Sequence, residues 1–426
     1  MRRKGPGGSA SVPSASCDRL HAPEVQPEQG LRGKLALERF PRSLKLKESF
    51  RSATDDFAPM RIGMVSCYCL DCLGGIEGWI EQVALRLRQR NAVSVITTDA
   101  GQRSVERVRT LAENGVSVHE IRRAYGLTPS PLDFPVLSRI LEEQDVAYFA
   151  YWPGGLELAT LLASHLSEVP VVVGYHLPMD PAKRIGAPPD TSVYHRFFGF
   201  KGIRIARRFK IHHAQDLDTV DFLRSHGFTD VNCIPCGVDL ARYPVRSKFD
   251  EFTVLFLGRL EFQKGADRIP LIARSLTQRQ LRFRLLVVGG GALERDLSRT
   301  PEPGVRLKGV VGDEEKLELL SRSHVLVMPS RWEGFPAAAL EACASGTPIV
   351  GSPVGGLREI IVEGKSGFTA SDPDQIGRRI ETVYRMWLER APYQELVETT
   401  KRSALRFDWD NVVPKLENLL VKAAGQ

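Results

Sequence analysis

The sequence predicts an α/β protein with two Rossmann-like domains, each built on a doubly wound parallel sheet. Its 426 residues exceed one typical hydrophobic core, and a hydrophobic content of 42% supports a globular chain. Strand-like apolar runs alternate with helical patterns, which is the arrangement of a parallel sheet covered by helices. The alternation begins near residue 60, pauses over residues 240–251 and resumes at residue 252. Two successive sheets are therefore expected.

The strand-like runs are short and apolar in both series. The first series comprises residues 61–66, 93–98, 116–121, 146–152, 169–176, 209–215 and 231–239. The second comprises residues 252–258, 283–291, 305–310, 324–330 and 347–352. After the Gly74-Gly75 turn, apolar residues recur at helical spacing from Ile76 to Leu87, so a helix is expected there.

These patterns divide the chain into four segments. Residues 1–59 are a basic tail or a wrongly assigned start, 60–245 form the first domain, and 246–405 form the second. Residues 406–426 form a last helix with an apolar face that returns to the first domain. Pro414 is awkward in that helix unless it falls in the first turn.

The tail differs from the rest of the chain in composition. It is rich in Arg, Lys, Ser, Pro and Gly without a sustained apolar period, so disorder is expected. It holds 11 Lys/Arg and 7 Asp/Glu, a net +4, which leaves only +3 of the chain's +7 for the remainder. It lacks the apolar region of a secretory signal. Three interpretations stay open: a targeting segment, an arm that touches membrane or nucleic acid, and untranslated sequence before a true start at Met60.

Apolar runs and cysteines exclude two classes of protein. No segment reaches the ~18 consecutive apolar residues that span a bilayer, so a soluble or peripheral protein is expected. Seven cysteines, an odd number, argue against a closed disulfide framework. The clusters Cys67/Cys69/Cys72 and Cys233/Cys236 could together hold zinc or an iron–sulfur cluster. Neither has the spacing of a paired metal motif, so reduced thiols are expected.

Residues 324–352 carry the clearest chemical signal. An apolar run is followed by a loop with Glu333 and Gly334-Phe335-Pro336, and then by an Ala/Leu-rich helix that carries Glu341. With Pro336 in its first turn, the amino end of that helix offers free amides and a positive dipole to a phosphate. Glu341 lies ~7 Å along the helix at ~1.5 Å per residue, and two ribose hydroxyls would satisfy its carboxylate. The alternative is an ordinary strand-loop-helix whose two glutamates face water.

This pattern resembles the Glu-x7-Glu motif of retaining GT-B glycosyltransferases, particularly glycosyltransferase family 4. The match extends through PSRWEGFP and SGTPIVGSPVGGLREIIVEGKSGF, and the similarity covers nearly everything after residue 60. The resemblance implies a GT-B fold with an acceptor domain followed by a nucleotide-sugar donor domain. It implies that Glu333 lies by the donor sugar and Glu341 binds the ribose. The backbone of Gly334, Phe335 and Pro336 would then meet the diphosphate and the sugar.

Two cations follow the first strand of the second series, Arg259 and Lys264 in GRLEFQKG. Alone, such a pair is usually surface charge. The resemblance implies that both contact the donor diphosphate, where they would stabilise the charge that grows on the leaving group.

Two features of the first domain match the family as well. His176, at the end of VPVVVGYH, coincides with a strand-end histidine near the acceptor, although a buried structural histidine is the alternative. Gly74 and Gly75 coincide with a glycine-rich loop that faces donor and acceptor. Two positions depart from the family: Asn91-Ala92 replaces the usual Gly-His, and Cys236 replaces a common asparagine.

Two weaker signals are assigned to the surface. Three Asp-x-Asp pairs begin at Asp216, Asp372 and Asp408, and none sits at a convincing strand end that faces the cleft, so we assign them to solvated surfaces and expect no metal site. The run KGIRIARRFK at residues 201–210 favours a solvated basic helix, with attraction of an anionic lipid or acceptor as the alternative.

Together these features predict a retaining, metal-independent hexosyltransferase. It would move a sugar from a nucleoside diphosphate sugar to a hydroxyl of a glycan, lipid or small-molecule acceptor, without any cofactor besides this donor. No nucleic-acid partner is expected. A cytoplasmic location is expected, with peripheral contact at the inner face of the membrane as an alternative. Two other functions stay open, a GT-B-type sugar-nucleotide epimerase and a nucleotide-sugar-binding subunit without turnover.

Overall fold

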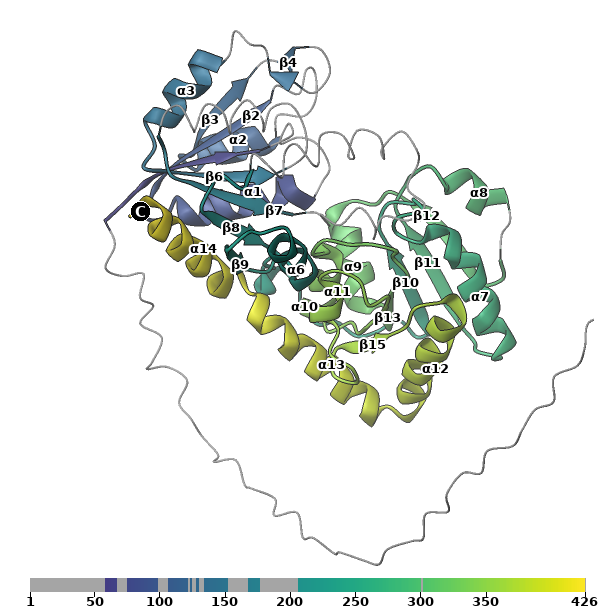
Figure 1. Cartoon of the computed structure of the whole chain (residues 1–426). Coiled ribbons are helices and arrows are strands. Elements are labelled where there is room, and N and C mark those ends of the chain that lie inside the picture. Colours follow the sequence, from purple (N-terminus) through teal and green to yellow (C-terminus); the bar gives the residue numbers. More distant parts are fainter. Residues whose placement is uncertain are drawn as a thin grey trace, which may run out of the picture. The chain divides into compact units, whose positions relative to one another are not determined.

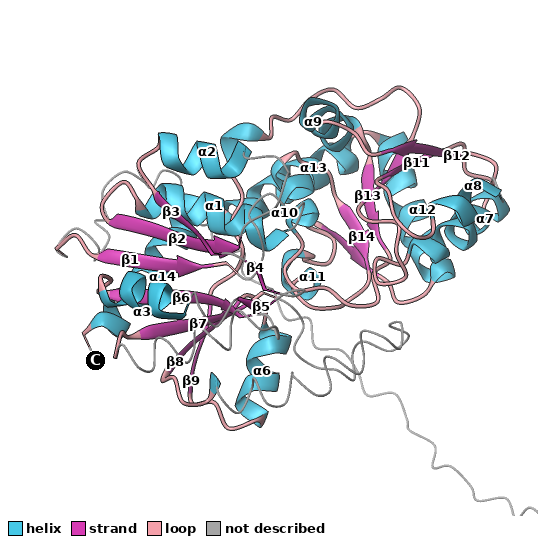
Figure 2. Ribbon diagram, turned by 90° about the horizontal axis from the view of Figure 1, so that it is seen from above, coloured by secondary structure: helices cyan, strands magenta, loops and turns pink. Residues whose placement is uncertain are grey.

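The computed structural model describes residues 58–66, 75–98, 106–121, 123–124, 128–129, 134–151, 168–176, 206–299 and 302–425. Within these residues lie two parallel sheets, one of seven and one of six strands, with helices packed against them (Figures 1 and 2). The predicted fold class of two doubly wound parallel sheets is confirmed. The residue boundaries predicted for the four segments stay predictions.

The N-terminal sheet has the strand order β3-β2-β1-β6-β7-β8-β9, and all its pairings are parallel. Its strands are β1 Arg61–Val65, β2 Ala92–Thr98, β3 Ser117–Ile121, β6 Val146–Tyr151, β7 Val171–Tyr175, β8 Ile211–Ala214 and β9 Asp230–Cys233. A separate antiparallel pair joins β4 Arg123–Ala124 and β5 Thr128–Pro129. The described helices around this sheet are α1 Gly75–Leu87, α2 Glu106–Glu113, α3 Phe134–Glu142 and α6 Leu217–Ser225.

Both faces of the N-terminal sheet are apolar, as a parallel sheet covered by helices requires. Alternate residues point to opposite faces, so Met64 packs in the same cluster as the buried residues of α1, while Val65 packs with those of α3 and α6. The predicted runs are therefore continuous apolar segments rather than alternating ones. Polar side chains such as His213 are rare exceptions inside these strands and need hydrogen-bond partners.

The C-terminal sheet has the order β12-β11-β10-β13-β14-β15 and is also fully parallel. Its strands are β10 Thr253–Leu257, β11 Arg284–Val288, β12 Val305–Gly309, β13 Val325–Met328, β14 Ile349–Gly351 and β15 Gly367–Thr369. Its helices are α7 Ile269–Gln278, α8 Glu294–Arg299, α9 Asp313–Arg322, α10 Ala337–Ala344, α11 Leu357–Ile360, α12 Pro373–Glu389 and α13 Ala391–Ala404. Val254 shares a cluster with α7 and α12, whereas Leu255 shares one with α9 and α10.

The last helix, α14 Trp409–Ala424, packs against β6, β7 and α1 of the N-terminal sheet. Its buried face carries Trp409, Val412, Val413, Leu416, Leu419, Leu420 and Ala423. Asp408 caps its amino end by accepting a hydrogen bond from the Asp410 amide at 3.0 Å. Pro414 lies inside the helix beyond its first turn. Among the described residues, no helix is both long and apolar enough to cross a membrane.

Candidate functional site

The strand order of the C-terminal sheet reverses between β10 and β13. From β10 the chain adds β11 and β12 on one side, and from β13 it adds β14 and β15 on the other. Open parallel sheets bind ligands outside the carboxyl ends of the strands at such a reversal. The loop after β10 carries Arg259 and Lys264, and the loop after β13 carries Glu333. The topology therefore places these predicted residues at the position where this sheet would hold a ligand.

Lys264 and Glu333 form a close ion pair at this reversal. The Lys264 Nζ lies 2.8 Å from Oε1 and 2.7 Å from Oε2 of the Glu333 carboxylate. The hydroxyl of Ser330 donates to Oε1 at 2.7 Å. The Glu333 side chain is only 3% exposed, so its charge is desolvated and needs these donors. An ammonium has three N–H groups, and the carboxylate occupies two of them.

A tight backbone contact holds the two loops together. Gly265 has φ +69°, and a Cβ at this position would lie 2.1 Å from the Pro329 carbonyl oxygen. The glycine after Lys264 is therefore required both by its conformation and by this approach. Arg331 adds a second tie, because it donates to both Asp267 carboxylate oxygens, at 2.6 and 2.7 Å, and stacks on Phe262. The position of the Lys264 ammonium is fixed by the backbone of the facing loop.

Residues 334–336 lead directly into α10. Pro336 is the N-cap residue, with φ −75° and ψ 116°, rather than a residue of the first turn as predicted. Gly355, with φ +49°, brings the loop after β14 against this segment, since a Cβ there would lie 2.2 Å from the Glu333 carbonyl oxygen. The Gly356 amide then donates to the Gly334 carbonyl at 2.8 Å. The loop after β14, which contains Gly355 and Gly356, therefore packs against the backbone that is predicted to face the phosphate.

Glu341 lies in α10 and already has protein donors. The Lys316 Nζ of α9 lies 3.0 Å from its Oε1, and the carboxylate is 16% exposed. The hydroxyl of Tyr243 is hydrogen-bonded to the same carboxylate, and burial followed by this neighbouring charge raises the pKa of Tyr243. The carboxylate was expected to need donors in an apolar stripe. Lys316 and Tyr243 supply them here.

Arg259 is the most exposed of the predicted cations. Its side chain is 59% exposed and pairs with Glu261 at 2.8 Å. It lies on the same loop as Lys264, but within the described part of the chain its guanidinium donates to Glu261 and Gln263 rather than to Glu333. A surface pair of this kind contributes little to folding, so Arg259 can exchange partners at little cost.

The predicted residue of the N-terminal sheet, His176, is buried directly after β7. Its Nε2 lies 2.9 Å from the Tyr148 hydroxyl on β6, and this hydroxyl lies 2.6 Å from Nδ1 of His213 on β8. Trp79 of α1 packs edge-on against the His176 ring at 4.4 Å. Gly174 makes room for this arrangement, because a Cβ there would lie 1.7 Å from the Tyr148 oxygen.

The hydrogen bonds assign the protons of this chain of three side chains. The His213 Nε2 faces the Ile234 carbonyl at 2.7 Å, so it carries hydrogen, and Nδ1 of the neutral ring is an acceptor. The Tyr148 hydroxyl therefore donates to His213 and accepts from His176 Nε2–H. Burial, then the nearby His213, keeps the pKa of His176 well below its usual value, so His176 is neutral at pH 7. Its Nδ1 is buried, and the Gln215 side chain interacts with the same ring.

The remaining predicted positions separate into described and undescribed ones. Gly75 is the first residue of α1, and a Cβ added there would meet no atom within 4 Å. Gly74 lies outside the described residues, as does the cluster Cys67/Cys69/Cys72. Burial raises the pKa of Cys233 and of Cys236 to about 12, which keeps both as thiols at pH 7. The described residues contain no group of three or more side chains suited to a metal ion.

Comparison with known proteins decides the family. The sequence profile of "Glycosyltransferase Family 4" matches residues 73–242, and that of "Glycosyl transferases group 1" matches residues 241–402. The chain belongs to the family 4 glycosyltransferases, and its fold is GT-B.

Curated relatives agree with this family. A glycogen synthase of Mycobacterium tuberculosis is 30% identical over 206 residues, which are 46% of this chain and 49% of the relative. The chain thus matches about half the length of the first curated relatives. A D-inositol 3-phosphate glycosyltransferase of Acidothermus cellulolyticus is 28% identical over 422 residues, covering 85% of this glycosyltransferase and 90% of the relative.

Solved structures share the fold. The crystal structure of Anabaena HepE in complex with UDP and glucose has a TM-score of 0.68 at 18% identity, and covers 85% of this chain and 100% of that one. Sucrose-phosphate synthase from Thermosynechococcus elongatus has a TM-score of 0.67 at 18% identity, and covers 85% and 98%.

Several residues of this glycosyltransferase site were missed by the sequence. Ser330, Lys316, Tyr243, Tyr148 and His213 all contact predicted residues, but none was itself predicted as a site residue, although Ser330 stands in the PSRWEGFP motif. Their partners lie far along the chain, so only the strand order brings them together. Ser330 is the exception, because it lies three residues before Glu333 in the loop after a strand.

The surface assignment of the Asp-x-Asp pairs was wrong in part. The first aspartate of each pair, Asp216, Asp372 or Asp408, is the N-cap of a helix, α6, α12 or α14 respectively. Asp216 is only 2% exposed and accepts from the Thr219 amide at 2.9 Å. The signal was an aspartate directly before a helical pattern, which is the usual position of an N-cap.

Proposed function

We propose that this family 4 glycosyltransferase transfers a hexose from a nucleoside diphosphate sugar to an acceptor hydroxyl with retention of the anomeric configuration, and without a metal ion. The observation that carries the proposal is the Lys264–Glu333 pair at the strand-order reversal of the C-terminal sheet. It supplies a half-buried, positioned cation and a buried carboxylate at the carboxyl edge of β10 and β13. A leaving diphosphate and a reacting sugar need this combination.

Lys264 would stabilise the departing diphosphate. Two of its N–H groups are held by Glu333, so the third can donate to a phosphate oxygen without breaking the pair. Arg259 is exposed and can leave Glu261 for the same diphosphate. Because Lys264 is held in place by Glu333 before the reaction, it stabilises negative charge as that charge develops. Lys264 and Arg259 would take the part that a divalent cation plays in other glycosyltransferases.

Glu341 would accept hydrogen bonds from the ribose of the donor. The carboxylate is 16% exposed and is held by Lys316 and Tyr243, so its orientation is fixed. The HepE structure contains UDP, and another structure of HepE contains UDP-glucose. This supports a UDP-sugar as the first donor to test. Val310, 76% exposed after β12, is an apolar side chain available to the base.

His176 would orient the acceptor or sugar rather than act as a base. Its Nδ1 is buried, and a sugar or acceptor hydroxyl would donate a hydrogen bond to this atom in competition with the Gln215 side chain. In the transfer, the bond between the sugar's anomeric carbon and the diphosphate oxygen breaks and the bond to the acceptor oxygen forms on the same face. The acceptor proton moves to the departing phosphate oxygen. No protein group then has to change its protonation state.

The first experiment is a thermal-shift panel with UDP-, GDP- and ADP-sugars. One of them should raise the melting temperature of the wild type, and Glu341→Ala should abolish that rise. Glu302→Ala is a matched control, since Glu302 is a carboxylate 14% exposed and paired with Arg274. It should leave the shift unchanged. Equal stabilisation of wild type and Glu341→Ala would refute the ribose assignment.

The second experiment determines the chemistry. With the stabilising donor and a panel of acceptors, NMR of the product should show the anomeric configuration of the donor, and a chelator should not slow turnover. Epimerised donor in the absence of any acceptor would favour the epimerase alternative. Donor binding with no turnover on any acceptor would favour the binding subunit. Inversion of configuration would contradict retention alone.

A further inference from the structure

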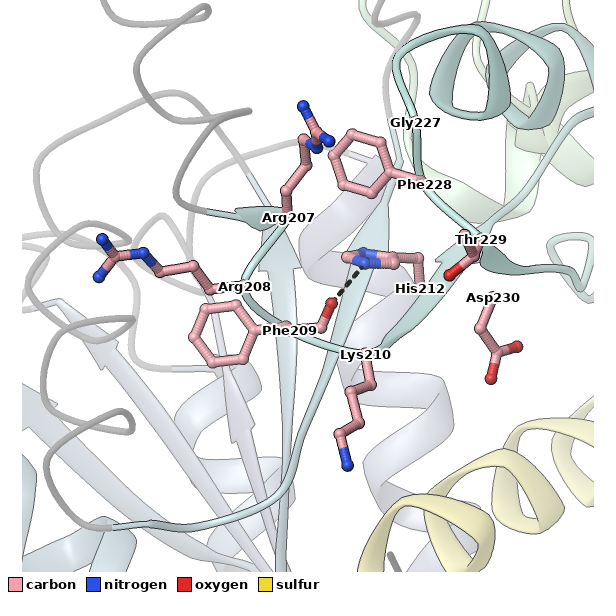
Figure 3. Close-up of a pocket in the computed structure, with 9 residues that line it drawn as sticks. All are labelled: Arg207, Arg208, Phe209, Lys210, His212, Gly227, Phe228, Thr229 and Asp230. Atoms are coloured by element: carbon pink, nitrogen blue, oxygen red, sulfur yellow. Dashed lines mark hydrogen bonds between the residues drawn. The ribbon is translucent and has the colours of Figure 1, made fainter.

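A second pocket lies at the opposite edge of the N-terminal sheet from His176. It is lined by Arg207, Arg208, Phe209, Lys210, His212, Gly227, Phe228, Thr229 and Asp230, and has a volume of about 510 Å³ (Figure 3). We call it the amino-edge pocket. Arg207–Lys210 lead into β8 and Gly227–Thr229 lead into β9, so the pocket opens where these parallel strands begin. His176 follows the carboxyl end of β7, and the pocket is therefore separate from the site described above.

The sequence predicted a basic helix over residues 201–210, and this prediction was wrong for the residues of this run that the structure describes as a turn. Residues 201–205 lie outside the described residues. Arg207–Lys210 form a turn that leads into β8 rather than a helix. Figure 3 shows the three basic side chains extending from this turn in different directions, with the His212 ring pointing at the Phe209 carbonyl. The basic run is therefore part of a pocket rim.

The three cations of this rim form no ion pair with another described residue. Arg207, Arg208 and Lys210 are exposed, and within the described residues none of them forms an ion pair. The one acid of the pocket, Asp230, is engaged elsewhere, because its Oδ2 accepts from Lys422 of α14 at 2.6 Å and its Oδ1 from Asn232 at 2.8 Å. The pocket consequently keeps an excess of positive charge.

Hydrogen bonds and ring contacts order the floor of the pocket. His212 Nε2–H donates to the Phe209 carbonyl at 2.9 Å, and the His212 ring packs edge-on against buried Phe228 at 4.6 Å. Gly227, with φ +83°, admits the Arg207 guanidinium, because a Cβ there would lie 3.1 Å from its Nη2. The Cα atoms of Arg207 and Lys210 are at most about 11 Å apart, close to one Debye length at 0.1 M salt, so the charges add to one positive potential at the pocket although the side chains diverge.

We propose that the amino-edge pocket binds a phosphate group, with the cations of Arg207, Arg208 and Lys210 as its counter-charges. A guanidinium pairs with phosphate through two parallel N–H donors, and an ammonium adds a point charge. The exposed Thr229 hydroxyl is a further donor at the rim. The phosphate can belong to a lipid headgroup or to a soluble phosphorylated molecule. The pocket is independent of the donor site.

The test is a triple variant, R207Q/R208Q/K210Q, compared with a control of equal charge change, K401Q/R402Q/K415Q. The control residues are exposed cations of α13 and α14 that form no ion pair within the described part of the chain. Melting temperatures of both variants should match the wild type, because all six side chains are exposed. Binding is measured to two probes, glycerol 3-phosphate by calorimetry, and phosphatidylcholine vesicles with and without phosphatidylglycerol by co-sedimentation.

We expect wild type and control to bind one of the two probes. R207Q/R208Q/K210Q should bind that probe roughly a hundredfold more weakly, since each cation contributes about fivefold near an anionic surface. Binding of the probe to wild type should weaken as the salt concentration is raised. Binding of phosphatidylglycerol vesicles alone identifies a lipid phosphate, and binding of glycerol 3-phosphate alone identifies a soluble one. No binding of either probe, or equal binding by the two triple variants, overturns the proposal.

Discussion

The ammonium of Lys264 lies 2.8 and 2.7 Å from the two carboxylate oxygens of Glu333, although the two residues stand in loops after different strands. Glu333 is almost completely buried, so its charge depends on this partner. Lys264→Met should therefore lower the free energy of unfolding by about 3 kcal/mol, the cost of an unpaired buried charge. Denaturant unfolding measures it. The double variant Lys264→Met/Glu333→Gln should recover most of this loss while remaining inactive.

The control for this prediction is Arg274→Met. Arg274 also pairs with a glutamate, but its side chain is 58% exposed, so the loss should be much smaller than that of Lys264→Met. If Lys264→Met and Arg274→Met lowered the free energy of unfolding equally, the burial of Glu333 would not control the stability of the two loops.

Tyr148 connects two histidines, and its removal leaves both with an unmet hydrogen bond. Tyr148→Phe should cost about 1–3 kcal/mol, because the buried His213 Nδ1 and His176 Nε2–H lose their partner. Turnover should fall further than stability explains, since His176 is no longer held in one orientation. Tyr384→Phe is the control, because the Tyr384 ring packs against Phe252 and Trp387 through ring contacts. A loss no greater than that of Tyr384→Phe would contradict the predicted proton arrangement.

Buried neutral histidines predict that acid destabilises the fold. Burial lowers the pKa of His212 and His213 to about 4 and that of His324 to about 3. The unfolded chain, with a histidine pKa near 6.5, therefore binds more protons than the folded chain between about pH 6.5 and pH 4. The stability is fully present above about pH 6.5 and falls as the pH falls, by about 3 kcal/mol for each such histidine at pH 4.

Urea unfolding between about pH 7 and pH 4 measures the slope of the free energy of unfolding against pH. His212→Gln should reduce it, whereas His119→Gln, at a half-buried position of β3, should leave it unchanged. A wild-type stability that does not vary across this range would show that these histidines are protonated within the fold.

Gly265 is needed for the loop that carries Lys264. Gly265→Ala combines a left-handed φ with a Cβ only 2.1 Å from the Pro329 carbonyl oxygen, so the two loops must separate. A loss of about 3 kcal/mol or more in unfolding free energy is expected, because backbone strain and a steric conflict add. Gly258→Ala in the same segment meets no atom within 4 Å and should change stability by about 0.5 kcal/mol at most. Similar effects of both substitutions would argue against the close approach.

The sequence predicted the fold from local periodicity, because every strand of a covered parallel sheet is itself an apolar run. It predicted Lys264 and Glu333 as members of one site through a family resemblance. It did not predict their contact, since that depends on β10 and β13 being neighbours. The same holds for Tyr148 and His213, which are 65 positions apart and meet because β6, β7 and β8 are adjacent.

Local signals were also misread where two physical requirements compete. Asp216 lies in a polar run and was therefore predicted at the surface. It is buried instead, because its side chain caps the amino end of α6. Pro414 lies inside α14 because the apolar contacts of that helix on the N-terminal sheet outweigh one missing backbone hydrogen bond. In both cases tertiary contacts decide the outcome.

The packing of α14 has a consequence for the order of folding during synthesis. The first sheet emerges from the ribosome long before Trp409, Leu416 and Leu420, which later cover β6 and β7. Until then an apolar sheet face stays open to water and to other chains, which exposes the nascent protein to aggregation. A released chain that ends before residue 409 should therefore engage holdase chaperones more strongly than the full chain.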